Sequence, residues 1–149
     1  CYTGALEVAL AADFIIAAES ARFGDTHAKW ALTPIWGMSQ RLPRRVGIAT
    51  AKRLMFTAEM IRADEAFRIG LTEMVVPDAE FDAAIEKLAG QITENSAFSH
   101  AANKRLLEAT DARDMDSGLQ WEVLNSEGVG PDMQARIGAF TGKSPKAKT

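Results

Sequence analysis

Two residues near the start of the chain have the types and the spacing for chemistry next to a carbonyl group. Gly4 opens an apolar segment typical of a helix, and Glu7 follows three residues later. A helix N-terminus has free backbone N–H groups that can bind a developing oxyanion, and residues three apart share a helix face. The spacing therefore predicts an oxyanion donor beside an acid/base group. The alternative is a buried helix with one hydrogen-bonded Glu.

His27 is a second candidate for acid/base chemistry. It follows a short apolar segment and precedes a stretch rich in Pro and Gly, where site residues often lie, and an imidazole titrates near neutral pH. The alternative is a structural or solvated histidine. A triad of Asp25, His27 and Ser39 can be drawn, but the spacing of the three residues does not support it. Trp30 and Trp36 are interpreted from their type as core or interface residues.

The sequence lacks the motifs of several other kinds of site. It contains no Gly-x-Gly-x-x-Gly, no phosphate loop ending in Gly-Lys-Ser/Thr and no Gly-x-Ser-x-Gly segment. The two histidines are far apart in the sequence and Cys1 is the single cysteine, so no metal site is expected. A net charge of −3 argues against nucleic acid as the main partner.

Composition is ordinary for one soluble globular unit, with 47% hydrophobic and 25% charged residues among 149. No apolar run approaches the roughly 20 residues that span a membrane, and no signal peptide is evident. The single cysteine fits a reducing compartment, so a cytoplasmic location away from membranes is expected. The chain begins inside a strand-to-helix pattern without Met, which predicts that it is the C-terminal portion of a longer protein.

Positive charge gathers between residues 26 and 58, a stretch with no Asp or Glu. One interpretation is a surface that faces phosphates or an acidic neighbouring subunit. The other is a solvated helix face whose Lys and Arg stems pack on apolar surface. The six cations are Lys29, Arg41, Arg44, Arg45, Lys52 and Arg53.

Apolar periodicity and turn residues predict the elements that position these groups. Gly70 is expected to form a left-handed cap after a helix, and the stretch from Pro34 to Pro43 is expected to hold a loop and a short helix. Helices are predicted over residues 4–12, 48–55 and 63–69, and strands over 13–18, 21–23 and 71–76.

The pattern becomes helical after Pro77. A stripe of Phe81, Ile85, Leu88 and Ile92 predicts an amphipathic helix. Asp78 is predicted to cap that helix and Ser96 the next one. A third helix is predicted over 117–126, and a last one with Pro131 in its first turn ends near Phe140. Residues 143–149 are predicted to be a disordered tail.

Segments in a fixed order resemble the signature of the enoyl-CoA hydratase/isomerase (crotonase) superfamily, and the order holds to about Lys104. They are Thr3–Glu7, Ala12–Ala17, Phe23–His27, Leu32–Leu42, Val46–Gly47, Ala51–Leu54, Ile61–Ala66, Gly70–Leu71 and Val75–Pro77. The resemblance implies an α/β fold, the crotonase-like (ClpP/crotonase) β-β-α superhelix. Residues 1–77 would be the C-terminal part of its core and residues 78–142 a helical trimerisation or lid region.

The resemblance also implies an acyl-CoA thioester substrate, with no separate cofactor because CoA is part of the substrate, and a homotrimer or hexamer. In that family two backbone N–H groups bind the thioester oxygen. Gly4 matches the position of one, and the other comes from an earlier loop. Glu7 matches the first of two glutamates that hold the added water, and His27 stands at the second position. Four further residues are predicted to line the substrate site: Thr3, Ala5, Trp30 and Pro34.

Two positions depart from the family pattern. An imidazole at His27 changes charge near neutral pH and cannot replicate a second carboxylate, and Ala5 adds a methyl where Gly is usual. Hydration of trans-2-enoyl-CoA to 3-hydroxyacyl-CoA is the expected reaction. Double-bond isomerisation and a non-catalytic acyl-CoA-binding homologue are the alternatives. On its own, this stretch is expected to expose core surface and to be inactive.

Overall fold

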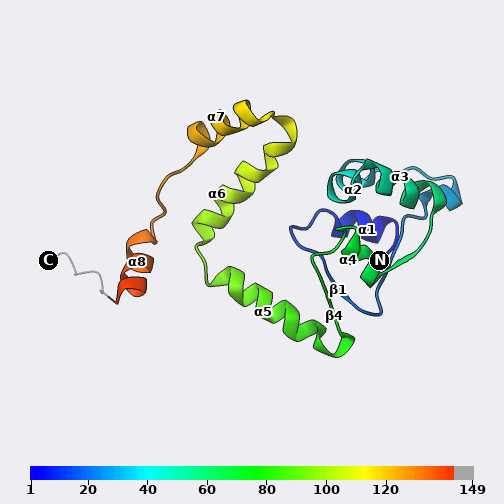
Figure 1. Cartoon of the computed structure of the whole chain (residues 1–149), viewed down its shortest axis with the longest axis horizontal. Coiled ribbons are helices and arrows are strands. Elements are labelled where there is room, and N and C mark those ends of the chain that lie inside the picture. Colours follow the sequence, from blue (N-terminus) through cyan, green and yellow to red (C-terminus); the bar gives the residue numbers. More distant parts are fainter. Residues whose placement is uncertain (143–149) are drawn as a thin grey trace. The chain divides into compact units, whose positions relative to one another are not determined.

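The computed structural model describes residues 1–142, and these residues form two compact units. The first unit is Cys1–Lys87, and the second begins at Leu88, inside helix α5 (Figure 1). The predicted disordered tail, residues 143–149, lies outside the described residues. The predicted division at residue 77 and the trimerisation role of residues 78–142 concern assembly and stay predictions.

The first unit alternates short helices and short strands (Figure 1). Two 3-10 turns, at His27–Trp30 and Asp78–Glu80, interrupt this order. The other elements are α1 (Gly4–Ala9), β1 (Ile16–Ala18), β2 (Arg22–Phe23), α2 (Met38–Val46), α3 (Ile48–Thr57), β3 (Ile61–Arg62), α4 (Ala63–Arg68), β4 (Met74–Val76) and the start of α5 (Phe81–Thr93).

Two strand pairs tie distant parts of this unit together. β1 pairs with β4 in parallel, with Ala17 opposite Val75, and β2 pairs with β3 antiparallel, with Phe23 opposite Ile61. β1 is shorter than predicted, because the N–H of Ile15 donates to the Glu73 carboxylate (2.5 Å) and not to a neighbouring strand. α1 likewise ends before residue 12, because the chain leaves the helix through tighter turns closed at Val8 and Ala9.

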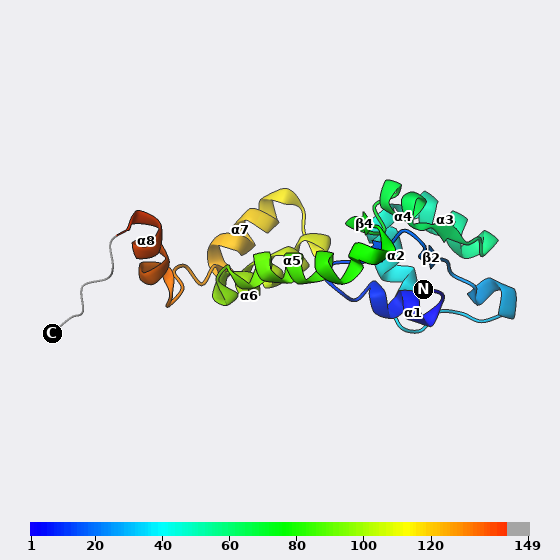
Figure 2. The ribbon, with the colours of Figure 1, turned by 90° about the horizontal axis from the view of Figure 1, so that it is seen from below.

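The core of the first unit lies where α1, α2 and α3 meet the strands. Helices α2 and α3 lie side by side in both views (Figures 1 and 2) and are separated by Gly47, whose φ of +80° is readily reached only without a Cβ. Gly70 has a φ of +77° after α4, so the predicted left-handed cap is confirmed. The largest fully buried apolar side chains are those of Leu6, Met38, Leu42, Leu54 and Leu71.

Asp78 binds the turn that follows β1 and not the helix after it, so its predicted capping role is wrong. Its carboxylate accepts hydrogen bonds from the Ser20 hydroxyl and from the Ser20 N–H (3.1 Å). The hydroxyl bond is the main reason that the pKa of Asp78 lies below its usual range. A 3-10 turn separates Asp78 from α5, so its side chain is too early in the chain to reach the helix N–H groups.

The second unit is helical. It holds the end of α5, α6 (Ala97–Glu108), a 3-10 turn (Thr110–Ala112), α7 (Met115–Asn125) and α8 (Met133–Thr141). The predicted helix over 117–126 is confirmed, with its start two residues earlier. Pro131 lies in the turn before α8 and not in its first helical turn. Among the helices in residues 1–142, none combines the length and apolar character that crossing a bilayer requires.

The caps of the second unit differ from the prediction. Ser96 occupies the N-cap position of α6, but its hydroxyl donates to the Asp132 carboxylate (2.9 Å) and accepts no N–H from the helix. Arg136 and Ser96, in that order of effect, hold the pKa of Asp132 below its usual range. Asp114 is the residue whose side chain caps a helix, because it accepts the Ser117 N–H (2.8 Å) at the start of α7.

The predicted apolar stripe on α5 is present and only partly covered, because Phe81, Leu88 and Ile92 are half-buried. No residue of α5 is buried, and Ile85 is exposed. Periodicity therefore identified the helix correctly.

The core predicts a strong response to loss of one side chain. Leu54 lies in α3 and is 1% exposed, so Leu54→Ala removes apolar contacts and leaves a cavity. We expect a loss of about 2–5 kcal/mol in the free energy of unfolding, measured by urea denaturation followed by circular dichroism. Leu32→Ala, at an exposed leucine of the same unit, should change the stability by less than about 0.5 kcal/mol. Equal losses in the two variants would show that the core is not where the structure places it.

Candidate active site

Glu7 is buried, and backbone groups from another segment hold one of its two oxygens. The side chain is 2% exposed. Its Oε1 atom accepts the N–H of Trp36 (2.9 Å) and the N–H of Met38 (3.1 Å), at the start of α2. A buried carboxylate requires such donors. Because both donors bind Oε1, Oε2 is the oxygen that faces a neighbouring group.

That neighbour is His27, which lies between two carboxylates. Its Nε2 atom is 3.9 Å from Glu7 Oε2, and its Nδ1 atom is 2.5 Å from Asp25 Oδ1. His27 is 8% exposed and Asp25 only 1% exposed. The site is therefore one buried polar row of three side chains. They come from α1 (Glu7), from the first 3-10 turn (His27) and from the loop before that turn (Asp25).

Ser39 does not join Asp25 and His27 in a triad, as the spacing indicated, but Asp25 and His27 do form a pair. Asp25 Oδ1 also accepts the backbone N–H of His27 (3.2 Å), because an Asp side chain readily folds back on the N–H two residues later. The Asp-x-His spacing in a polar turn is the sequence signal that would have indicated this pair. Ser39 is exposed, and its hydroxyl accepts from the Gln40 side chain (3.3 Å).

Gly4 stands at the start of α1 with an available donor. The N–H groups of Ala5 and Glu7 bind the carbonyls of Tyr2 and Thr3, whereas no acceptor for the Gly4 N–H is recorded within residues 1–142. Thr3 directs this peptide from a strained conformation, with a φ of +52°. Such a conformation costs about 1–3 kcal/mol and persists only where neighbouring contacts impose it.

Hydrogen bonds to the loop at residues 24–26 hold Thr3 in place. The Thr3 N–H donates to the Gly24 carbonyl (2.9 Å). The Thr3 hydroxyl accepts the Thr26 N–H (3.1 Å) and shares a hydrogen bond with the Thr26 hydroxyl (2.5 Å). The Thr3 side chain, predicted to line the substrate site, is thus engaged with the loop that carries Asp25 and His27.

The other predicted lining residues lie at the surface of the first unit. Ala5 is exposed, Pro34 is half-buried and Trp30 is 68% exposed. Trp36 is 60% exposed, and its ring lies against Gly4, because a Cβ placed on Gly4 would be 2.8 Å from Trp36 Cζ3. Neither tryptophan fills the core of this unit.

Four of the six cations between residues 26 and 58 bind acceptors of this chain. Arg44 donates to the Gln40 carbonyl (2.8 Å). Arg41 donates to the Trp36 carbonyl (2.6 Å) and Arg45 to the Leu71 carbonyl (2.9 Å). Arg53 pairs with Glu59 and Glu65. Arg41 thus supports the turn that donates to Glu7. For these four side chains the structural interpretation of the basic stretch is the better one.

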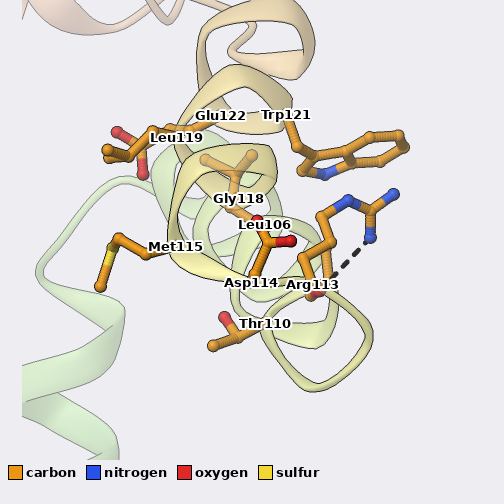
Figure 3. A pocket seen from close by; sticks show the side chains of 10 residues that line it. Leu106, Thr110, Arg113, Asp114, Met115, Gly118, Leu119, Trp121 and Glu122 are labelled. Atoms are coloured by element: carbon orange, nitrogen blue, oxygen red, sulfur yellow. Dashed lines mark hydrogen bonds between the residues drawn. The ribbon is translucent and has the colours of Figure 1, made fainter.

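A separate cavity of about 220 Å³ lies in the second unit between α6 and α7. Figure 3 shows the Arg113 guanidinium over the Trp121 ring, 3.8 Å from its centre. The lining contains none of the residues predicted for the site. Within residues 1–142, no group of three His, Cys, Asp or Glu side chains is arranged to hold a metal ion.

Fold and site together define a class of protein: an α/β unit in which a free backbone N–H stands beside a buried carboxylate and an imidazole. Residues 1–140 match the family model described as enoyl-CoA hydratase/isomerase. The chain belongs to this family, as its resemblance predicted.

Two bacterial relatives and one solved structure illustrate the likeness. A crotonyl-CoA hydratase of Syntrophomonas wolfei is 40% identical over 120 residues, covering 80% of this chain and 46% of the relative. A short-chain-enoyl-CoA hydratase of Clostridioides difficile is 38% identical over 119 residues, covering 80% and 77%. The crystal structure of enoyl-CoA hydratase from Bacillus anthracis superposes with a TM-score of 0.90 at 36% identity, covering 97% of this chain and 57% of that one.

These comparisons confirm the predicted crotonase-like fold. The chain spans about half the length of the first curated relative that it matches.

The contact between Gly4 and Trp36 makes a specific prediction. Gly4→Ala places a methyl 2.8 Å from Trp36 Cζ3, so the ring must move, and we expect a loss of about 1–3 kcal/mol in the free energy of unfolding. In a Trp36→Ala background the same change should be close to neutral, because the clash is gone. Gly90→Ala, at a helical glycine with open space around it, is the control and should stabilise slightly. A Gly4→Ala loss that is equal in both backgrounds, measured by urea denaturation, would contradict the contact.

Proposed function

We propose that this chain carries acid/base and oxyanion-binding groups of an acyl-CoA enzyme that adds water to trans-2-enoyl-CoA, giving 3-hydroxyacyl-CoA. The observation that carries the proposal is the contact between Glu7 Oε2 and His27 Nε2, which are 3.9 Å apart. Glu7 lies on the helix that begins with the free N–H of Gly4. The hydratases among the relatives support the choice of reaction.

The Gly4 N–H would bind the thioester oxygen of the substrate. Addition of water at C3 pushes negative charge onto that oxygen, and a positioned N–H stabilises the charge more in the transition state than in the ground state. Thr3, held by the loop at residues 24–26, fixes the peptide that carries this N–H. The donor is therefore in place before the substrate binds.

Glu7 and His27 would hold the attacking water. A water oxygen about 2.8 Å from each of two atoms that are 3.9 Å apart has roughly a right angle between its two contacts, which suits a water molecule. Because the Trp36 and Met38 N–H groups bind Oε1, Oε2 is the oxygen placed for proton transfer. The hydroxyl of the water bonds to C3 and a proton ends on C2, with Glu7 as the acid/base group and His27 orienting the water.

Double-bond isomerisation is the second candidate, because His27 stands where a hydratase of this family has its second glutamate. An isomerase needs one acid/base group to move a proton between C2 and C4, and Glu7 alone would suffice. A third possibility is a homologue that binds acyl-CoA without turning it over.

Substitution at Glu7 and His27 tests the catalytic assignment. In the full-length protein with crotonyl-CoA, we expect loss of the absorbance of the conjugated thioester. Glu7→Gln keeps an oxygen for the two N–H groups but removes proton transfer, so kcat should fall about 10²- to 10⁴-fold. His27→Ala should also lower kcat, and Glu86→Gln, at an exposed glutamate on α5, should leave kcat within twofold.

The outcomes separate the three candidates. Conversion of a trans-3-enoyl-CoA without loss of crotonyl-CoA would favour isomerisation. Tight binding of acyl-CoA without turnover of either substrate would favour the non-catalytic homologue. Unchanged turnover in both Glu7→Gln and His27→Ala would refute the assignment of this row as catalytic.

The second unit supports a proposal about assembly as a homotrimer or hexamer. It exposes many large apolar residues, and exposed apolar surface of this extent is typical of protein–protein contacts. These residues lie along its helices and in the turn before α8. They are Leu107, Met115, Leu119, Trp121, Val123, Leu124, Val129, Ile137 and Phe140. Sedimentation equilibrium of the full-length protein should give three or six copies, and a monomer at micromolar concentration would contradict the proposal.

A further inference from the structure

Asp25 is a buried carboxylate to which the proposed reaction assigns no step. It lies on the opposite side of His27 from Glu7, with its Oδ1 atom 2.5 Å from His27 Nδ1. At 1% exposure it is as buried as the core leucines. A buried carboxylate requires an explanation, because removing it from water costs free energy of folding unless partners compensate.

The hydrogen bond between Asp25 and His27 fixes where the imidazole proton lies. An ionised carboxylate only accepts hydrogen bonds, so Nδ1 of His27 must donate. In a neutral ring the other nitrogen, Nε2, then has a free lone pair. Asp25 Oδ1 also accepts the backbone N–H of His27 (3.2 Å), which ties the carboxylate to the same turn and prevents the ring from rotating freely.

The position of that lone pair matters because Nε2 is the atom that faces Glu7 Oε2 at 3.9 Å. With a lone pair on Nε2, both atoms accept, and a water between them donates both of its hydrogens. The lone pairs of the water oxygen then point away from the two residues, towards an electrophilic carbon. With the proton on Nε2, the ring would instead donate to the water oxygen and occupy one of its two lone pairs, which draws electron density away from the attack.

We propose that Asp25 is a positioning residue that holds His27 with its proton on Nδ1, so that Nε2 accepts a hydrogen from the nucleophilic water. The consequence for turnover rests on the proposed hydration reaction. The effect on the imidazole proton does not depend on that reaction, so experiment can refute the tautomer and the hydration reaction separately.

The chain offers a direct test, because it contains two histidines and their acceptors lie at opposite ring nitrogens. His100 Nε2 lies 2.8 Å from the carbonyl oxygen of Ile92, an acceptor, so its neutral ring should carry the proton on Nε2. In the full-length protein labelled with ¹⁵N-histidine, long-range ¹H–¹⁵N spectra at a pH where both rings are neutral distinguish the two tautomers. His100→Gln assigns the signals.

In the wild-type protein we expect the Nδ1–H form for His27. Asp25→Asn puts an amide that can donate beside Nδ1, so the Nε2–H form of His27 should become substantially populated while the His100 signals stay unchanged. With crotonyl-CoA, kcat should fall at least about tenfold with KM within about twofold. Asp114→Asn removes a carboxylate but keeps an N-cap on α7, and should alter neither the His27 tautomer nor kcat.

A wild-type His27 in the Nε2–H form overturns the proposal without any variant. The proposal therefore stays testable even if Asp25→Asn does not fold. An unchanged tautomer in Asp25→Asn also overturns it, as does a changed tautomer with unchanged kcat. If the wild-type protein turns over no enoyl-CoA, the proposed function fails, while the tautomer of His27 still decides whether Asp25 sets the ring.

Discussion

The buried carboxylate of Glu7 is the interaction on which the site depends. It joins α1 to the start of α2, because its Oε1 atom accepts the N–H groups of Trp36 and Met38. Removing a charge from water is costly unless donors replace the lost hydration, and these two N–H groups supply that replacement. The Oε1 atom therefore holds the two segments together, and the Oε2 atom is fixed opposite His27. The same contact therefore stabilises the fold and selects the oxygen available for chemistry.

A second set of contacts fixes the peptide of the backbone donor, at the start of the helix that carries this carboxylate. The loop at residues 24–26 binds Thr3 through both its main chain and its hydroxyl, and so imposes the strained conformation that leads into Gly4. This loop also begins the turn that carries His27. A displacement of the loop would move the oxyanion donor and the imidazole together, which couples the two halves of the proposed chemistry through a few hydrogen bonds.

Sequence patterns predicted the parts of this arrangement that depend on near neighbours. The Gly4–Glu7 helix start, α3 and the Gly70 cap follow from helix periodicity and from backbone freedom at glycine, and the structure contains them. The Asp78 cap was wrong because Ser20, distant in the sequence, competes for the carboxylate. The pairing of Asp25 with His27 was not predicted, because it depends on how one turn folds, with the Asp25 carboxylate accepting the N–H two residues later. The family resemblance, and not spacing, was what singled out His27 as the partner of Glu7.

The most direct test of the central claim is a crystal structure of the full-length protein with butyryl-CoA, which has no double bond to hydrate. The account predicts the thioester oxygen about 3 Å from the Gly4 nitrogen, and a water that contacts both Glu7 Oε2 and His27 Nε2 next to C3 of the acyl chain. A thioester bound away from Gly4, or an acyl chain whose C3 lies out of reach of the Glu7–His27 row, would contradict it.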